Sequence, residues 1–385
     1  MWEFNETKCC LIAIDHIGFS KENANQLRID IGDVLSIPKD KVMLCFSHTH
    51  SAPNESIEAE YFKFLCKQVK SGVLQAIENM IPIMVAWNNT YGDIGVNRRA
   101  GSHELDNRIG ILKVTEASSK KLRLLLLRLT AHANVLKADN YLISADYFGA
   151  VRDLLKRKYD CDVMLTQGAS GNVAPKYYKS STIPIDANDP VRFCNSETAL
   201  EDMAHEIYKH LDCVINNMET HMVEHLEMYS VYQDLLADVP SYGRAIKIAE
   251  EAKREAGIDG TSWLKEVQRL CDNGIRQQVD TTEIQYFALG NGCLCGVANE
   301  VMCEFALRAK FIHNDLFYLG GYTNGCTGYF PTEEEYDRGG YEVYWSMLIY
   351  YIYHGRVFPL NRDCASLLIE EAVKNAPQFL ANCRK

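Results

Sequence analysis

The sequence predicts an α/β fold, with a mixed or largely parallel β-sheet core layered with helices. Short apolar segments of strand length alternate along the chain with longer segments that repeat apolar residues at helical spacing. The 385 residues are enough to bury a large core. Apolar residues make up 47% and charged residues 24% of the chain, which is the balance of an ordinary globular protein.

The alternation is regular in the first half of the chain. The apolar run Cys9–Asp15 has the length of a buried strand, and the amphipathic segment Ser20–Leu35 predicts a helix after it. Val42–Phe46 is apolar throughout, and Glu55–Asn79 carries apolar residues at helical intervals. The same patterns predict strands at Ile81–Asn88, Ile109–Val114, Lys121–Thr130 and Asp162–Thr166, and a helix at Asp146–Tyr159.

A stretch of about residues 176–280 departs from this alternation. It opens with an irregular polar loop to Asp189 and continues with helical patterns at 197–211, 241–256 and 263–273 and one strand-like pattern at 223–232. We therefore predict a single domain over residues 1–385 with an inserted helical subdomain at about 176–280. Beyond it, strands are expected at Glu283–Leu289, Cys293–Val297 and Leu316–Leu319, and helices at 300–312, Tyr341–Tyr353 and Cys364–Asn375.

Charge and cysteine content narrow the class of protein. A net charge of −11 and a pI of 5.5 argue against binding to nucleic acid or to an anionic membrane surface. No apolar run reaches transmembrane length, and Met1–Asn5 lacks the pattern of a signal peptide. The fourteen cysteines are scattered with no Cys-x-x-Cys pair, which predicts free thiols in a cytoplasmic protein and no thiolate zinc site.

The segment Ser47–Asn54 is the first candidate for a functional site. It follows the apolar run Val42–Phe46 and contains His48 and His50. In extended backbone, residues i and i+2 point to the same face, so the two imidazoles are expected to project together. Neutral imidazole is a common zinc ligand, and the alternative is a pair of polar loop histidines.

Polar residues follow several other predicted strands in the same way. In α/β sheets, ligands bind at the carboxyl ends of the strands, so these residues are expected to lie around one binding site at that edge of the sheet. Nitrogen and oxygen donors without a thiolate suit a catalytic zinc, which keeps one position open for water. For any one of these residues alone, a polar cap is the better explanation, and it is their recurrence at the same end of several strands that predicts a site. The set comprises Asp15, His48, His50, His132, the turn 168–175, Glu300, Tyr322 and Tyr329.

These motifs resemble, in the same order, those of the neutral/alkaline (non-lysosomal) ceramidases. Ser47–Pro53 is similar to the family's Thr/Ser-His-Thr-His-Ser-Gly-Pro motif. The resemblance covers most of the chain outside about 176–280. Its further parts are Asn97-Arg98-Arg99, His132 with Asn140, Ser144 and Asp146, Gly171–Pro175 (like Gly-Asp-Val-Ser-Pro), Val297–Glu300 (like Val-Pro-Gly-Glu), and Tyr322–Tyr341 with Thr332–Tyr336.

The resemblance implies a fold like the ceramidase catalytic domain and a zinc-dependent hydrolase of amide bonds that acts on a small N-acyl substrate in lipid metabolism. The implied Zn²⁺ ligands are His48, His132, Glu300 and Tyr329. The resemblance also implies catalytic roles for His50, Arg98 and Tyr341, beside the scissile carbonyl and its oxyanion. Gly168 and Asn172, in the glycine-containing turn, are expected to contact the substrate.

Departures from the family pattern keep alternatives open. Ala52 replaces the motif glycine, and Asn172 and Ala174 replace an Asp and a Ser, the latter considered catalytic in the family. These changes weaken ceramide as the substrate more than they weaken a zinc hydrolase. One alternative is a barrel amidohydrolase in which His48 and His50 are both ligands. Another is a catalytically inactive, ceramidase-like binding protein. For Arg98 the alternative is a surface salt bridge.

Overall fold

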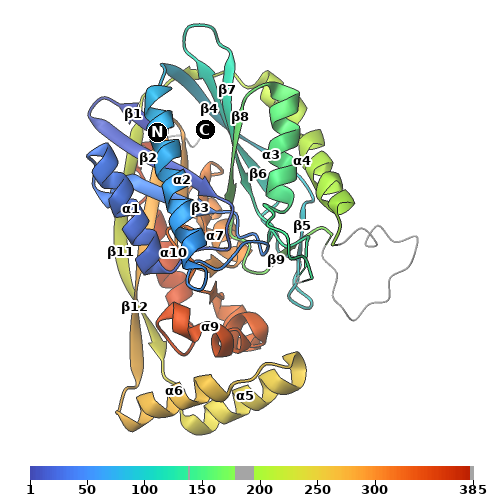
Figure 1. Cartoon of the computed structure of the whole chain (residues 1–385), viewed down its shortest axis with the longest axis vertical. Coiled ribbons are helices and arrows are strands. Elements are labelled where there is room, and N and C mark those ends of the chain that lie inside the picture. Colours follow the sequence, from blue (N-terminus) through green and yellow to red (C-terminus); the bar gives the residue numbers. More distant parts are fainter. Residues whose placement is uncertain (138, 178–194, 382–385) are drawn as a thin grey trace.

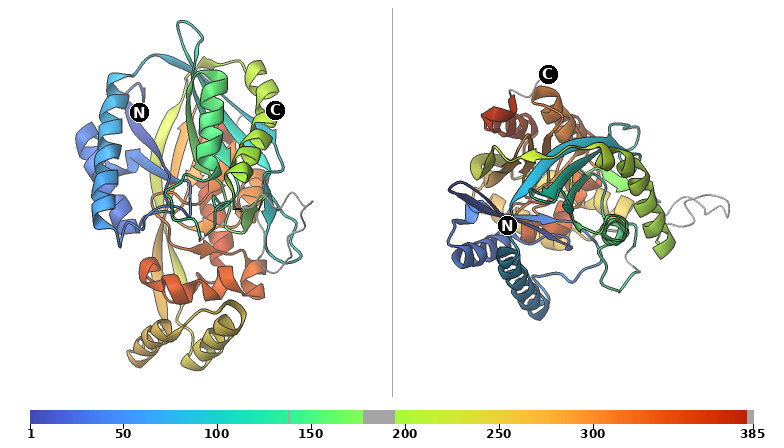
Figure 2. Two further views of the ribbon diagram at one scale, coloured as in Figure 1. Left: turned by 45° about the vertical axis from the view of Figure 1, so that its right-hand side comes forward. Right: turned by 90° about the horizontal axis from the view of Figure 1, so that it is seen from above.

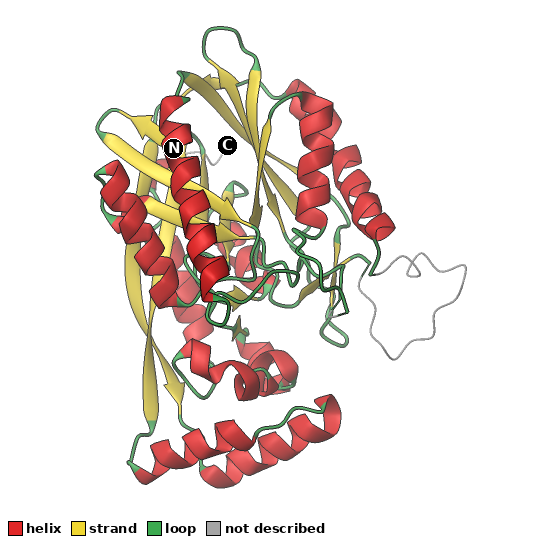
Figure 3. Cartoon of the chain, viewed as in Figure 1, coloured by secondary structure: helices red, strands yellow, loops and turns green. Residues whose placement is uncertain are grey.

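Two layers of β-sheet pack face to face, and helices cover the outer side of each layer (Figures 1 and 3). The computed structural model describes residues 1–137, 139–177 and 195–381. The predicted α/β fold with a mixed sheet is confirmed. Each sheet, however, has helices on one face only, because its other face packs against the second sheet layer.

The N-terminal part contributes a three-stranded sheet of order β1-β2-β3. Strands β2 and β3 are parallel, and side chains alternate between α1 and α2 on one face and the second sheet on the other. Helix α1 begins after Ser20, whose side chain accepts the Asn23 N–H. The bounds are β1 (Trp2–Phe4), β2 (Thr7–Ile14), α1 (Lys21–Leu35), a 3₁₀ turn (Lys39–Lys41), β3 (Val42–Phe46) and α2 (Ala59–Glu78).

A five-stranded mixed sheet of order β10-β4-β6-β7-β8 forms the second layer. Helices α3 and α4 cover its outer face over a cluster of leucines and isoleucines. Its inner face meets β2, β3, β12 and β13. The bounds are β4 (Ile83–Tyr91), β6 (Arg108–Glu116), β7 (Leu122–Leu129), α3 (Tyr147–Tyr159), β8 (Asp162–Gln167), α4 (Glu197–Asn217) and β10 (His221–Met222).

A four-stranded sheet of order β11-β12-β13-β15 lies in the same layer as the N-terminal sheet. Helices α7 and α10 cover it from outside. The short pair β14 with β16 joins two loops of this sheet, and the pair β5 with β9 joins two loops of the five-stranded sheet. The bounds are β5 (Gly95–Asn97), β9 (Val173–Pro175), β11 (Leu226–Asp238), β12 (Gln277–Leu289), β13 (Gly292–Gly296), β14 (Glu300–Val301), α7 (Cys303–Ile312), β15 (Phe317–Gly320), β16 (Tyr329–Phe330), α10 (Cys364–Lys374) and α11 (Gln378–Ala381).

The segment 176–280 is only partly helical. Helix α4 packs on the main core, and β11 pairs along its whole length with β12, so these elements belong to the central layers. The loop predicted to Asp189 falls mostly within 178–194, outside the described residues. The part that stands apart is the pair α5 (Tyr242–Ala256) and α6 (Thr261–Asp272), at the lower end of the molecule in Figures 1 and 2.

Helices α5 and α6 hold a C-terminal segment through their own apolar core, which is formed by residues such as Trp263, Val267 and Leu348. This segment comprises a π-helical turn (Tyr341–Trp345) and α9 (Met347–His354), and the short helix α8 (Glu333–Arg338) precedes it. The helix predicted over Tyr341–Tyr353 is thus broken into a π turn and α9. Within the described residues, no helix is both long and apolar enough to span a membrane.

Candidate metal centre

His48 is placed by the backbone of the loop that follows β3. Strand β3 ends at Phe46, and His48 has a left-handed φ of 60° while its N–H donates to His16 O at 3.0 Å. The prediction that His48 lies in extended backbone, with its side chain on the same face as that of His50, is therefore wrong. The turn instead brings the two rings edge to face, with centroids 5.1 Å apart. His48 Nδ1 donates to Ile17 O at 2.6 Å, which leaves Nε2 free to accept.

His132 is held in the same manner in the loop after β7. Its N–H donates to Val173 O at 2.9 Å, and its Nδ1 lies 2.7 Å from Ser170 O. Its Nε2 is buried and has no hydrogen-bond partner. Because Nδ1 donates to a carbonyl in each case, His48 and His132 both present an unprotonated Nε2 to the same point.

The Glu300 carboxylate lies between the Nε2 atoms of His48 and His132. Its Oε2 lies 3.2 Å from His48 Nε2 and 3.2 Å from His132 Nε2, and this buried oxygen also has no hydrogen-bond partner. An unpaired buried acceptor costs roughly 1–3 kcal/mol. Zinc ligands lie about 2.0–2.2 Å from the metal, so two ligands of a tetrahedral ion are about 3.3 Å apart. The spacing and the unpaired atoms fit a cation bound between these three side chains.

The protonation states suit such an ion. Burial alone would raise the pKa of Glu300, but the neighbouring His48 and His132 hold it well below its usual range. Burial, assisted by the charge of Arg98, lowers the pKa of His132 to about 4. Glu300 is therefore ionised and His132 neutral near pH 7, as zinc ligands must be.

Tyr329 lies beside Glu300 because β14 and β16 pair in parallel with these two residues in register. Its ring stacks 6.4 Å from that of His132. Its hydroxyl accepts a hydrogen bond from Arg98 Nη2 at 2.9 Å. Burial raises the pKa of Tyr329 well above its usual value, against the opposing charge of Arg98.

Arg98 is a partly buried residue of the site, and its ion pair with Glu342 lies at the site rather than on the open surface. Its Nε donates to Glu342 Oε1 at 2.9 Å, and its Nη2 donates to Gly171 O at 2.7 Å. Burial opposes the charged form, but Tyr329, Glu342 and Glu300 raise its pKa above the usual value. The guanidinium is thus a fixed positive charge next to Tyr329.

His50 and Tyr341 stand around the same centre. His50 is exposed, and its N–H donates to Ala133 O at 3.2 Å. Metal-binding nitrogens of His48, His50 and His132 lie within 4.8 Å of one another, so His50 could also reach an ion. The Tyr341 ring lies 6.0 Å from that of Tyr329. Geometry therefore leaves two donor sets, which differ in whether His50 or the Glu300–Tyr329 pair completes the site.

Gly168 and Asn172 lie behind the site rather than in it, which corrects the expectation that they contact the substrate. Asn172 is fully buried, its Nδ2 donates to both oxygens of Glu304 at 3.0 Å, and its Oδ1 accepts the Cys303 N–H. A side chain at Gly168 would meet Thr130 Oγ1 at 2.1 Å. The turn instead supplies the carbonyls that orient His132 and Arg98.

A pocket of about 120 Å³ is lined by His48, His50, Glu300, Tyr329 and Tyr341. Its walls include residues that the sequence did not single out: Phe19, Glu55, Cys326, Tyr350, Tyr353 and His354. Most of them come from the α1 start and from α9, segments that no motif connects with the histidines. The only sequence signal for α9 was its unusual density of tyrosines.

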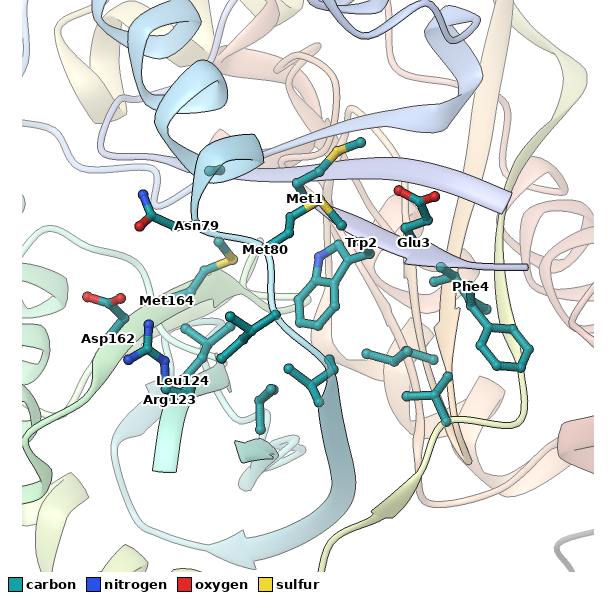
Figure 4. A pocket seen from close by; sticks show the side chains of 17 residues that line it. Met1, Trp2, Glu3, Phe4, Asn79, Met80, Arg123, Leu124, Asp162 and Met164 are labelled. Carbon is teal, nitrogen blue, oxygen red and sulfur yellow. The ribbon is translucent and has the colours of Figure 1, made fainter. Parts of the chain in front are cut away.

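A second cavity, of about 270 Å³, lies away from this centre and is lined by Met1, Trp2, Met80, Leu124 and Met164 among others (Figure 4). Its lining is mainly apolar and contains none of the predicted site residues. We assign no chemistry to it.

The architecture matches solved structures. The neutral ceramidase from Pseudomonas aeruginosa superposes with a TM-score of 0.65 at 16% sequence identity, over 94% of this chain and 65% of that one. This chain has the fold of the neutral ceramidases. A ceramidase complexed with C2 gives a TM-score of 0.66 at 15% identity, over 94% of this chain and 66% of that one. No family model matches the sequence, and no curated protein matches it.

This fold decides one alternative. The strands of the described residues form separate open sheets that pack in layers, and no closed barrel is present among them. The barrel amidohydrolase alternative is therefore wrong as a fold assignment. The chain spans about two thirds of the length of each ceramidase structure it matches.

Proposed function

We propose that this protein is a zinc-dependent hydrolase of amide bonds in small N-acyl substrates. The observation that carries the proposal is the convergence of His48 Nε2 and His132 Nε2 on Glu300 Oε2 at 3.2 Å, with buried atoms left unpaired. Imidazole and carboxylate donors without a thiolate are the ligands of hydrolytic zinc sites. The ceramidase fold supports an amide as the bond that is cleaved.

In this proposal His48, His132, Glu300 and Tyr329 hold the ion. When bound, zinc lowers the pKa of a coordinated water toward neutrality and polarises the scissile carbonyl. Tyr329 completes the set because its register with Glu300 puts both side chains on the same side of the β14–β16 pair. Arg98, whose hydrogen bond to Tyr329 would favour the phenolate, supports this choice.

Arg98, Tyr341 and His50 stabilise the developing charge and transfer a proton. Arg98 is held by Glu342 and Gly171 and stabilises negative charge that develops on the carbonyl oxygen. Tyr341 faces the same pocket and donates a hydrogen bond to that oxygen. His50, exposed at the mouth, delivers a proton to the leaving nitrogen.

The test measures metal content and activity together. Protein prepared without chelator should contain one zinc, and His48→Ala, His132→Ala and Glu300→Ala should lose it. His205→Ala, an exposed histidine on α4, is the matched control and should keep it. Tyr329→Phe should weaken zinc binding while His50→Ala should keep zinc and lose turnover. Zinc loss in His50→Ala with full occupancy in Glu300→Ala would favour a three-histidine site.

The inactive binding protein is the rival that remains. Ala174, whose replacement of a family serine motivated it, is fully buried in β9 opposite Val96 and does not line the pocket. Its substitution therefore removes no group from the pocket itself. Bound zinc without turnover of any N-acyl or ester substrate would favour the rival. A cytoplasmic location and a role in lipid metabolism belong to the same proposal.

A further inference from the structure

The candidate site consists of two unequal spaces that meet at His50 and Asn54. We call the 120 Å³ pocket beside Glu300 the inner chamber. The second space, about 520 Å³, is the outer groove, which runs past Ile57 and the loop 140–143. His50 and Asn54 line both spaces, whereas the other residues of each line only one.

The two spaces accommodate different parts of the substrate. The proposed ligands His48, Glu300 and Tyr329 line the inner chamber and not the outer groove. A carbonyl that reacts at the centre therefore has one substituent in each space. Since His50 delivers the proton to the nitrogen from the junction, the amine faces the open groove and the acyl chain enters the chamber.

Size then limits the acyl chain. A cavity of about 150 Å³ holds one benzene molecule, and the inner chamber is smaller than that. Aromatic rings of Phe19, Tyr350 and Tyr353 line the chamber. Helix α9, which carries the last two, is fixed through Leu348 to the core of α5 and α6. A longer chain would meet this helix, whose packing against that core opposes its displacement.

Charge narrows the class further. Glu55 is buried in the wall of the chamber, and its Oε1 accepts hydrogen bonds from Ser20 N at 2.8 Å and Ser56 Oγ at 3.1 Å. Together with Glu300 it makes the chamber unfavourable for an anionic acyl group. The groove, by contrast, is lined by the exposed side chains of Ile57, Tyr141 and Leu142 and places no comparable limit on the amine.

We propose that the inner chamber is the acyl subsite and restricts the substrate to neutral acyl groups of about two to four carbons, whereas the amine portion can be large. This inference rests on the proposed function. Tyr350 and Tyr353 are then specificity-determining residues, because they line the chamber together with the proposed metal ligands.

Two series of amides test the assignment on the zinc-loaded protein. The first keeps p-nitroaniline as the amine and extends the acyl group from acetyl to dodecanoyl, with succinyl added. The second keeps acetyl and enlarges the alkyl substituent of the anilide. We expect kcat/KM to fall about tenfold or more for each methylene beyond the limit, and to vary less than tenfold along the second series. Equal rates for butyryl and octanoyl, or a limit in the amine series instead, would overturn the inference and leave the hydrolase intact.

A variant pair on α9 tests the wall. Tyr353→Ala should bring the octanoyl substrate within tenfold of butyryl, whereas Ile352→Ala, an exposed neighbour outside both spaces, should leave the length limit in place. A binding arm works without turnover. Butyrate should bind to the zinc-loaded protein more tightly than octanoate by calorimetry, and Tyr353→Ala should reverse that order. Equal binding of the two acids overturns the inference even if no amide is cleaved.

Discussion

Replacing Asn172 by aspartate should destabilise the protein in a pH-dependent way. Asn172 is fully buried, and its Nδ2 donates to both carboxylate oxygens of Glu304. The substitution exchanges one heavy atom, Nδ2 for an oxygen, at nearly the same volume, so it separates electrostatics from packing. It replaces the donor with a second carboxylate about 3 Å from the first. The ceramidase motif that this turn resembles has aspartate at this position.

The size of the effect follows from the contacts. The variant loses hydrogen bonds to a charged group, which are worth roughly 1.5–3 kcal/mol, and adds like-charge repulsion. Burial already raises the pKa of Glu304, and the Asn172 amide works against that rise. In Asn172→Asp the two carboxyls share a proton, so their folded-state pKa rises above the unfolded value. The folded variant then binds more protons, and its stability falls by about 1.4 kcal/mol per pH unit above about pH 4.3 until the shared proton leaves.

Urea denaturation of wild type and variant between pH 4.5 and pH 8 measures this. We expect a loss near 1 kcal/mol at pH 4.5 that grows by about 1.4 kcal/mol per pH unit to about 3 kcal/mol near pH 6, and that then levels off once the shared proton has left. Asn5→Asp, in an exposed turn, is the control and should change stability by less than about 0.5 kcal/mol at every pH. A loss that does not depend on pH would refute the reasoning, because it would point to geometry rather than charge.

Three further predictions concern other contacts. Gly171→Ala should weaken zinc binding about tenfold or more in a chelator competition, because its Cβ would lie 2.4 Å from Glu300 O; unchanged affinity would show that this contact does not position Glu300. Gly72→Ala in α2 should raise the unfolding free energy by about 0.5–1 kcal/mol, because nothing lies within 4 Å of the added methyl; destabilisation would contradict this. Arg28→Met should cost about 3–5 kcal/mol at pH 7, because it removes the buried guanidinium that forms the ion pair with the partly buried Glu283. Burial raises the pKa of Glu283, but Arg28 holds that pKa below its usual value. The stabilisation by this ion pair is therefore present above about pH 4.3 and is lost as pH falls through the lower folded-state pKa. Thermal unfolding should show a much smaller difference between wild type and Arg28→Met at pH 3 than at pH 7.

Local patterns were enough to locate most elements. Val42–Phe46 forms β3 with the bounds that its apolar run predicts, because all five residues are buried in the strand. The break at Tyr341–Trp345 was not predictable, since a π turn depends on the hydrogen bonds of Trp345 and Ser346 to the residues five positions before them, Gly340 and Tyr341. Strand β11 also extends beyond its predicted end because its pairing with β12 continues to Asp238.

The sequence by itself determined the donor types and their order along the chain: imidazoles at 48, 50 and 132, a carboxylate at 300 and a phenol at 329. Tertiary structure alone decided which atoms meet. Backbone carbonyls of Ile17 and Ser170 select the free nitrogen of each histidine, and hydrogen bonds to the Glu304 carboxylate hold Asn172 away from the pocket. The sequence pattern indicates what a side chain can bind, but the partner that it does bind is 31, 38 and 132 residues away in these three cases and is brought close only by folding.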